Sequence, residues 1–491
     1  MKKYILSIDA GTTGITVILL NKFGDVINKE YSEFTQIYPK PSWVEHCPNE
    51  IWELTLLLIK HTLKKYNSSE IDSIGITNQR ETTVLWNKNS GKPIYNAIVW
   101  QCKRTSEICT QLKNEGLSTV FESKTGLLID SYFSGTKINW ILNHVENAQR
   151  LAENGDILFG TIDTWLLWNL TNSKIHATDY TNASRTLIYN IDDKCWDDKL
   201  LSILNIPKQI LPQVFSSSSI YGYTDKKLFD EEIPIAGIAG DQQSALFGQN
   251  GFTPNSIKNT YGTGCFLLVN TGQKRINSTT GMLNTLACDE YGNPVYALEG
   301  SVFIGGAVMQ WIRDELGFIK NASESEDVAM SIENTGGVYM VPAFTGLGSP
   351  YWDMDARGLI CGITRGTNKS HLVRAGLESI AYQVKDLIDG IQSNLAEPLT
   401  ELKVDGGATQ NDFLMQFQSD ILDIKINKPV NIETTATGAG YLAGLATGFW
   451  KSSSDLISAR KVDKVYHPNI ANKKRELLIS GWRKAINKTL K

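Results

Sequence analysis

The chain has 491 residues, of which 42% are hydrophobic and 20% charged, and its formal net charge is -4. This length exceeds what a single hydrophobic core usually supports, and it predicts two domains. A charge this close to neutral gives no general attraction to nucleic acid or to an anionic membrane, so we expect neither as a partner.

Seven cysteines are scattered along the chain, and no two of them form a C-x-x-C pair. Their spacing argues against a zinc site and against a disulfide framework. The first apolar run ends at Asp9, well before the length that a secretion signal needs, and the other apolar runs are too short to span a bilayer. We therefore expect a soluble protein of the reducing cytoplasm.

The chain opens with two apolar, β-prone segments, 4–8 and 15–20, joined by the Gly/Thr-rich segment 9–14. Such a pair predicts a β-hairpin, followed by a turn at 21–25 and a further short strand. The segment 9–14 can hold phosphate with its backbone N–H groups and Thr hydroxyls, and its carboxylate can hold Mg²⁺ through water. A plain solvated hairpin turn explains this segment equally well.

Helical and strand patterns alternate in the residues that follow. A helix is predicted after the acidic turn at 48–50, and a buried strand at 71–77. Residues 136–150 and 163–170 again show helical periodicity. This mixture of elements predicts an α/β fold.

A polar, Ser-rich stretch at 215–232 carries few periodic apolar residues and is the strongest candidate for a boundary region. We place the N-terminal domain at 1–247 and the C-terminal domain at 248–491. Residues 256–270 then repeat the opening order of strand, Gly/Thr turn and strand. The repeated order hints at two related domains that face one another.

Glycine turns that lead into helices occur at three further places, 237–241, 305–310 and 404–411. Glycine lets a phosphate or a flat ring approach the backbone, and the N-terminus of a helix supplies favourable donors. Each turn is also a common way to begin a helix. Asp241, at the end of the first of them, is explained more simply as an N-cap than as a catalytic base.

The adjacent charges Arg80 and Glu81 have two explanations as well. Their side chains point to opposite sides of a strand but can converge from a loop, and a surface ion pair of little energetic value is the simpler explanation. The chain has no Walker A sequence and no G-x-G-x-x-G after an early strand, so the P-loop and Rossmann folds lose support.

The order and spacing of these turns resemble the actin-like, or ribonuclease H-like, ATPase fold, which pairs two α/β domains across a cleft. Longer blocks narrow the resemblance to the FGGY family of carbohydrate kinases, over residues 4 to about 450. The block at 78–83, Asn-Gln-Arg-Glu-Thr-Thr, indicates the members that act on glycerol, because related pentulose kinases lack it. The other matching blocks are 99–101, 131–137, 240–249, 261–266 and 342–383.

The resemblance implies transfer of the γ-phosphoryl group of ATP to glycerol, giving sn-glycerol 3-phosphate in the first step of glycerol utilisation. It implies Asp241 as the general base, and Asp9 with Asp241 as the holders of Mg²⁺. A homo-oligomer, either dimer or tetramer, is also implied. The residues that match glycerol-binding positions are Arg80, Glu81, Trp100, Tyr132, Asp241, Gln242 and Phe266. Those that match nucleotide-binding positions are Thr12, Thr13, Gly14, Thr263, Gly306, Gln310, Gly407 and Asn411.

Two departures from the family pattern bear on function. Thr16 stands where the family usually has Arg, so one cationic contact to the ADP phosphates is expected to be missing. Some relatives carry a phosphorylatable His, and others a Gly-Arg loop for fructose 1,6-bisphosphate, in the region of 222–234. That segment has neither His nor Arg here, and we expect both regulatory inputs to be absent.

Two alternatives stay open from the sequence. One is a kinase of the same family that acts on a pentulose or a tetritol, and the other is a nucleotide-binding sensor without catalysis. The presence of both Asp9 and Asp241 argues against a loss of catalysis.

Overall fold

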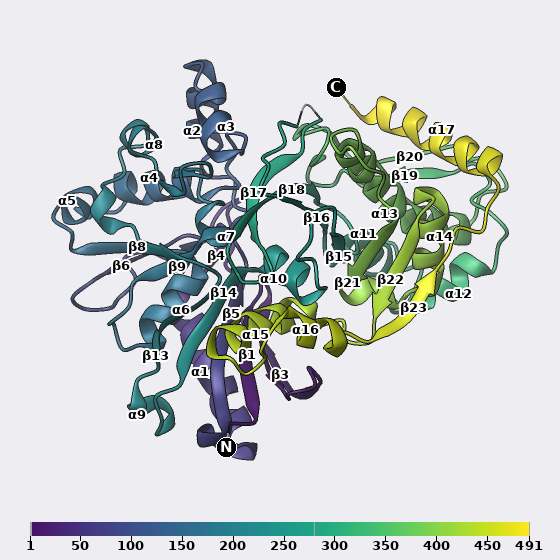
Figure 1. The fold of residues 1–491 in the computed structure, drawn as a ribbon. Helices are drawn as coiled ribbons and strands as arrows, with labels where there is room; N and C mark the ends of the chain where they lie inside the picture. Colours follow the sequence, from purple (N-terminus) through teal and green to yellow (C-terminus); the bar gives the residue numbers. More distant parts are fainter. Residues whose placement is uncertain (1, 279, 491) are drawn as a thin grey trace.

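Two β-sheets form the framework of the chain in the computed structural model, which describes residues 2–278 and 280–490. The first sheet belongs to the N-terminal half, and its strands lie in the order β13-β14-β5-β1-β2-β3 (Figure 1). β1 pairs antiparallel with β2 and parallel with β5, so the hairpin predicted at the start of the chain is confirmed. The strands are β1 (Tyr4–Ala10), β2 (Gly14–Leu20), β3 (Val26–Glu33), β5 (Ile71–Asn78), β13 (Ser218–Tyr223) and β14 (Pro234–Gly240).

The second sheet is built from the C-terminal half, in the order β17-β18-β16-β15-β21-β22-β23. Within it, the order β18-β16-β15-β21-β22 repeats the order β3-β2-β1-β5-β14 with the same parallel and antiparallel pairings. The two related domains suggested by the repeated opening pattern are thus confirmed as repeated topology. The strands are β15 (Ile257–Tyr261), β16 (Cys265–Gly272), β17 (Leu283–Cys288), β18 (Pro294–Val302), β21 (Glu401–Asp405), β22 (Lys425–Pro429) and β23 (Val462–Tyr466).

Alternate residues of the first sheet face two different layers of helices. Leu6 shares an apolar cluster with residues of α1 (Pro48–Lys65), whereas Ile5 and Ile18 share another with residues of α15 (Thr434–Thr447). Strand side chains alternate between the two faces of a sheet. Coverage of both faces explains why β1 and β2 read as nearly continuous apolar runs rather than as an alternation.

The helix α15 comes from the C-terminal half of the chain but packs on the sheet of the N-terminal half. A Cβ atom on Gly75 would lie 2.2 Å from the backbone oxygen of Ala439, and one on Gly237 would lie 2.6 Å from the same atom. Glycine at both strand positions therefore permits the close approach of this helix. The helix α10 (Asp241–Gly248) lies along α15, and together they join the two halves.

Helices also cover the second sheet, and a separate group packs at the outer side of the first (Figure 1). Those in contact with the second core are α11 (Ala307–Asp314), α12 (Glu324–Met330), α13 (Lys369–Gln392), α14 (Asp412–Leu422) and α17 (Asn472–Thr489). The remaining helices are α2 (Ser106–Asn114), α3 (Ser118–Thr125), α4 (Ser134–His144), α5 (Ala148–Glu153), α6 (Ile162–Leu170), α7 (Tyr180–Ala183), α8 (Asp198–Ile203), α9 (Lys226–Phe229) and α16 (Ser453–Ala459).

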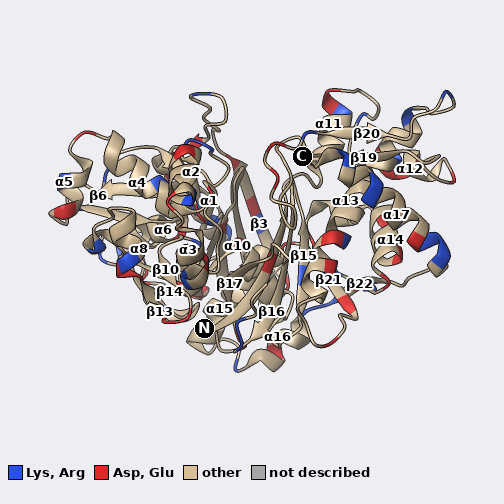
Figure 2. Ribbon diagram, turned by 90° about the horizontal axis from the view of Figure 1, so that it is seen from above, with Lys and Arg blue, Asp and Glu red and all other residues tan. Residues whose placement is uncertain are grey.

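Short strands complete the fold in two-stranded sheets. They are β4 (Glu45–His46), β6 (Val84–Asn87), β7 (Ala97–Ile98), β8 (Ile157–Gly160), β9 (Ala177–Asp179), β10 (Tyr189–Asn190), β11 (Cys195–Trp196), β12 (Gln213–Phe215), β19 (Tyr339–Val341) and β20 (Leu359–Cys361). Acidic and basic residues are interspersed over both halves (Figure 2). Within 2–278 and 280–490, every helix is too short or too polar to cross a membrane.

Two local predictions were wrong. The stretch 215–232 is not a boundary, because it contains β13, the edge strand that pairs antiparallel with β14. Its polar composition reflects the open side of an edge strand. The single helix predicted over 136–150 is instead two helices, α4 and α5, separated where Asn147 adopts a φ of 60°.

Candidate active site

The loop after β5 brings Arg80 and Glu81 together. Glu81 has a φ of 61°, which is uncommon for a residue other than glycine and is a feature of functional sites. This backbone conformation places Glu81 Oε1 3.9 Å from Arg80 Nε, and both side chains are only 2% exposed. The convergence predicted for a loop is therefore confirmed, and the simpler explanation as a surface ion pair is wrong.

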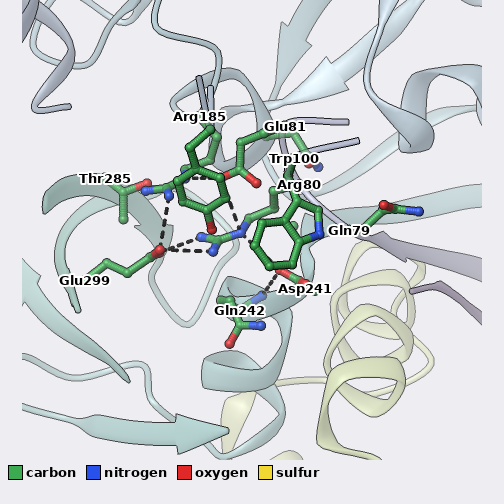
Figure 3. Close-up of polar contacts among 12 residues, drawn as sticks. Gln79, Arg80, Glu81, Trp100, Arg185, Asp241, Gln242, Thr285 and Glu299 are labelled. Atoms are coloured by element: carbon green, nitrogen blue, oxygen red, sulfur yellow. Dashed lines mark hydrogen bonds and ion pairs between the residues drawn. The ribbon is translucent and has the colours of Figure 1, made fainter. Parts of the chain in front are cut away.

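Asp241 is the first residue of α10, and Gly240 before it is the N-cap. Its Oδ1 accepts a hydrogen bond from the backbone N–H of Gln242 at 2.7 Å and lies 3.0 Å from Arg80 Nε (Figure 3). The side chain keeps 26% of its surface exposed, so this carboxylate can meet a ligand. The N-terminus of a helix is also a favourable place for a negatively charged side chain.

Two charged residues that the sequence did not predict complete this cluster, Arg185 and Glu299 (Figure 3). Glu299 receives hydrogen bonds from Arg80 at 2.5 and 3.0 Å and from Arg185 at 3.1 Å. Burial alone would raise the pKa of Glu299, but the guanidiniums of Arg185 and Arg80 outweigh it and hold this pKa at about 2. Glu299 is therefore ionised, and it connects two arginines of the N-terminal half to the second sheet.

Aromatic rings from both halves adjoin this cluster. The centroid of Trp100 lies 5.4 Å from that of Tyr132 and 6.1 Å from that of Phe266, which is on β16. Trp100 Nε1 also donates to the Thr12 hydroxyl at 3.0 Å. The predicted phosphate turn and the predicted polyol residues are thus neighbours.

Gln242 is held by a lysine of the second sheet. Lys258 Nζ donates to Gln242 Oε1 at 2.5 Å and to Thr260 Oγ1 at 2.8 Å. An ammonium group can only donate, so the amide oxygen of Gln242 must face Lys258. The NH₂ group of Gln242 is consequently turned the other way, as a donor. Burial lowers the pKa of Lys258 to about 8.

Three predicted nucleotide residues lie in adjoining loops of the C-terminal half. The N–H of Gly305 donates to the carbonyl of Thr263, and that of Gly306 to the carbonyl of Gly262, each at 2.8 Å. A Cβ atom on Gly406 would lie 2.6 Å from the backbone oxygen of Tyr261, so this turn packs closely against the other two. A Cβ atom on the adjacent Gly407 would meet nothing within 4 Å. The loops that carry Thr263, Gly306 and Gly407 are therefore in contact, and Gly407 has open space beside it.

The remaining predicted nucleotide residues have individual surroundings. Asn411 is the N-cap of α14, where its side chain accepts from the N–H of Leu414 at 2.8 Å. Gln310 is exposed on α11, and Thr13 is exposed in the first turn. Packing alone explains glycine at position 14, because a Cβ atom on Gly14 would lie 2.6 Å from the backbone oxygen of Ser32. Their role toward a nucleotide stays a prediction.

Two family models match almost the whole chain. Residues 4–248 match the N-terminal domain of the FGGY family of carbohydrate kinases, and residues 257–447 match its C-terminal domain. The chain belongs to the FGGY family of carbohydrate kinases. The family predicted from the sequence blocks is confirmed.

Curated relatives of this FGGY kinase match it over its full length. The glycerol kinase of Thermoanaerobacter pseudethanolicus is 57% identical over 493 residues, which cover 100% of this chain and 99% of the relative. Glycerol kinase 2 of Thermotoga maritima is 54% identical, with 99% of each chain covered. Both relatives are named glycerol kinase, and both match this chain from end to end.

Solved structures agree with the fold. The Plasmodium falciparum glycerol kinase with ADP has a TM-score of 0.92 and 39% identity, with 99% of this chain and 98% of that chain covered. A ligand-bound xylulose kinase from Lactobacillus acidophilus has a TM-score of 0.89 at 23% identity, with 99% and 97% covered. The predicted two-domain α/β fold is confirmed by this likeness.

In this FGGY kinase, Asp9 lies on β1, and the negative charge of Asp241 acts on its carboxylate. Burial, with smaller contributions from the charges of Asp241 and Glu433, raises the pKa of Asp9 to about 8. Within 2–278 and 280–490, no three His, Cys, Asp or Glu side chains form a group that could cage a metal ion. Two carboxylates fit Mg²⁺ nonetheless, because this ion commonly binds through one or two carboxylates, water and substrate phosphates.

Thr16 lies on β2 directly across from Asp9 in the antiparallel register. Side chains of paired residues share one face of a sheet, so Thr16 is beside Asp9 and is buried. The position at which the family resemblance implies Arg therefore offers only a hydroxyl next to this carboxylate. The expected loss of one cationic phosphate contact stays a prediction.

Proposed function

We propose that this FGGY kinase phosphorylates glycerol with ATP and releases sn-glycerol 3-phosphate and ADP. The observation that carries the proposal is the single buried cluster in which Arg80 meets both Glu81 and Asp241. Relatives named glycerol kinase, 54–57% identical over 99–100% of the chain, support the same substrate.

The chemistry of the cluster matches a small polyol. Glycerol has hydroxyls that each donate and accept, on a short apolar backbone. Glu81 and Asp241 supply acceptors, Arg80 and the Gln242 amide supply donors, and Trp100 with its neighbouring rings supplies faces for C–H groups. A pentulose would need room and hydrogen bonds for two further hydroxylated carbons.

Asp241 accepts the proton of a terminal hydroxyl in the proposed reaction. The hydroxyl oxygen forms a bond to the γ-phosphorus of ATP while the bond from that phosphorus to the β–γ bridging oxygen breaks, and ADP leaves. The turn at 12–14 would receive the transferring group, next to Trp100. Catalysis of this kind depends mainly on positioning and electrostatics.

Asp9 and Asp241 would hold Mg²⁺ in the proposed enzyme. The ion would neutralise charge on the polyphosphate when bound. Burial is the main reason that the pKa of Asp9 is raised to about 8, and the charge of Asp241 adds to it; a cation between the two carboxylates would offset that second contribution.

We further propose the domain boundaries, the cellular location and the oligomeric state that the sequence predicts. The division into 1–247 and 248–491 is supported by the assignment of one sheet to each half. Residence in a reducing cytoplasm is supported by the seven unpaired cysteines. Assembly into a dimer or tetramer is proposed from the family resemblance.

The substrate is tested by release of ADP from ATP with glycerol, erythritol or xylulose as acceptor. We expect kcat/KM for glycerol to exceed the other two values by at least ~10-fold, because added hydroxyls must find partners in a site shaped for three carbons. Equal or greater kcat/KM for xylulose would contradict the glycerol assignment and favour a pentulose kinase.

A second test concerns the lysine behind Gln242. Lys258→Met is expected to raise the KM for glycerol ~3- to 10-fold, because the Gln242 oxygen loses its donor and the amide is free to rotate. The KM for ATP should change by less than ~2-fold. Both constants are measured by steady-state kinetics on the full chain.

Lys403→Met is the matched control. Lys403 also lies in the second sheet and donates to two backbone carbonyls, those of Gln249 and Asn250, but touches none of the polyol residues. Its replacement should leave the KM for glycerol unchanged. If Lys258→Met also leaves it unchanged, Lys258 does not orient the Gln242 amide.

A further inference from the structure

A carboxylate of the C-terminal half fixes the arginine of the polyol site. Glu299 lies within β18, and its side chain is fully buried. Arg80 Nη1 donates to Glu299 Oε2 at 2.5 Å, and Arg80 Nη2 donates to Glu299 Oε1 at 3.0 Å. A two-point contact sets the plane of a guanidinium as well as its position.

The same carboxylate reaches Glu81 through a second arginine. Glu299 Oε1 also accepts from Arg185 Nη2 at 3.1 Å, and Arg185 Nε donates to Glu81 Oε1 at 2.6 Å. Glu299 therefore lies between two guanidiniums and fixes their separation. The contacts continue through Arg80 to Asp241, so all three charged polyol-site residues connect to Glu299.

Removal of the Glu299 charge would change what Arg80 can bind. Buried guanidiniums need anionic partners. Arg80 would keep Asp241 at its Nε atom and the Gln243 amide oxygen 3.2 Å from its Nη1 atom, but its two terminal nitrogens would lose their only anionic partner. The Glu299 charge also offsets the repulsion between Arg80 and Arg185, so its removal would leave the two guanidiniums repelling each other. Arg80 would move toward Asp241, away from the position it now holds.

We propose that Glu299 is a positioning residue for polyol recognition that acts through Arg80. This inference rests on the proposed function. It adds that a residue of the C-terminal half fixes the position of Arg80, a recognition residue of the N-terminal half. Burial of this carboxylate in the middle of a strand, at the cost of its hydration, is explained by that task.

The first test is Glu299→Gln in the full chain, which keeps the shape but removes the charge. We expect the KM for glycerol to rise at least ~10-fold, while the KM for ATP stays within ~3-fold, because only the polyol side loses its geometry. An unchanged KM for glycerol would overturn the proposal. An equal rise in both constants would overturn it as well, since that result indicates general loosening.

Glu378→Gln is the matched control. Glu378 is another buried carboxylate of the C-terminal half, and it accepts from Arg374 Nε at 2.8 Å, away from the polyol cluster. Its loss also breaks a buried Glu–Arg pair. We expect both KM values to stay within ~3-fold even if the melting temperature falls.

A double-mutant cycle decides whether Glu299 acts through Arg80. Arg80→Lys keeps the charge but removes the fork that Glu299 binds. In the Arg80→Lys background, Glu299→Gln should lower kcat/KM for glycerol by less than ~2-fold, although it lowers it at least ~10-fold in the wild type. Additive effects of the two substitutions would overturn the proposal.

A second variant and a preliminary assay of the wild type complete the experiment. If Glu299→Gln does not fold, Glu299→Asp, which keeps the charge but shortens the reach, enters the same cycle with the same expected pattern. The wild type is assayed first with the three acceptors. Failure to phosphorylate glycerol would remove the proposed function, and the cycle would then be run with the acceptor that the wild type prefers.

Discussion

Asp241→Asn is expected to reduce glycerol phosphorylation at least ~10²-fold while ATP still binds. An amide keeps the shape of the carboxylate and can still accept from the N–H of Gln242, now at 2.7 Å, but it cannot take up the hydroxyl proton. The measurements are ADP release with saturating glycerol and ATP affinity by isothermal titration. Turnover within ~10-fold of the wild type would remove Asp241 from the role of base.

Asp230→Asn provides the control for Asp241→Asn. Asp230 is an exposed residue that ends α9 in a left-handed conformation, with a φ of 60°, and Asn tolerates that conformation well. We expect unchanged turnover and unchanged ATP affinity. A similar loss in both variants would show that the effect of Asp241→Asn is not specific to the site.

The opening hairpins of both halves were predictable because their signal is local. Runs of β-branched residues around a Gly/Thr turn indicate two adjacent strands wherever they occur. The break between α4 and α5 was not predictable in this way, because residues 145–147 contain neither Gly nor Pro. The edge strand β13 was missed because polar, exposed residues are typical both of linkers and of edge strands.

Only part of the site could be predicted from the sequence, because some of its residues are far apart along the chain. Residue blocks matching a known family pointed to Arg80, Glu81 and Asp241, and the structure brings these three together. Glu299 is separated from Arg80 by 219 positions, so no local pattern connects them. A signal for it exists all the same: Glu299 is a lone charge within the apolar strand β18, as Lys258 is within β15. A charge in such a strand needs a buried partner.

The second large effect concerns Asp9. Asp9→Asn is expected to lower kcat at least ~10²-fold, because the proposed Mg²⁺ site loses one of its two carboxylates and charge neutralisation by a metal supplies several kcal/mol. The measurement is ADP release over a range of Mg²⁺ concentrations. Asp386→Asn is the control. Burial also raises the pKa of Asp386, to about 6, but this residue lies on α13 and accepts hydrogen bonds from Trp482 and Tyr351, neither of which belongs to the cluster. Its turnover should not change.

The Asp9→Asn substitution is expected to raise the stability of the protein while it lowers the activity. The pKa of Asp9 is about 8 in the folded protein, above its ordinary value of 3.8, so its ionisation destabilises the fold increasingly as pH rises from about 4 to about 8. The cost is at most ~1.4 kcal/mol per pH unit, and partial solvent access reduces it.

Without added metal, Asp9→Asn should therefore melt higher than the wild type at pH 8.5 and nearly equally at pH 5. A lower melting temperature at pH 8.5 would contradict this origin of the raised pKa. A gain in stability together with a loss of turnover would instead identify Asp9 as a carboxylate retained for catalysis at the expense of the fold.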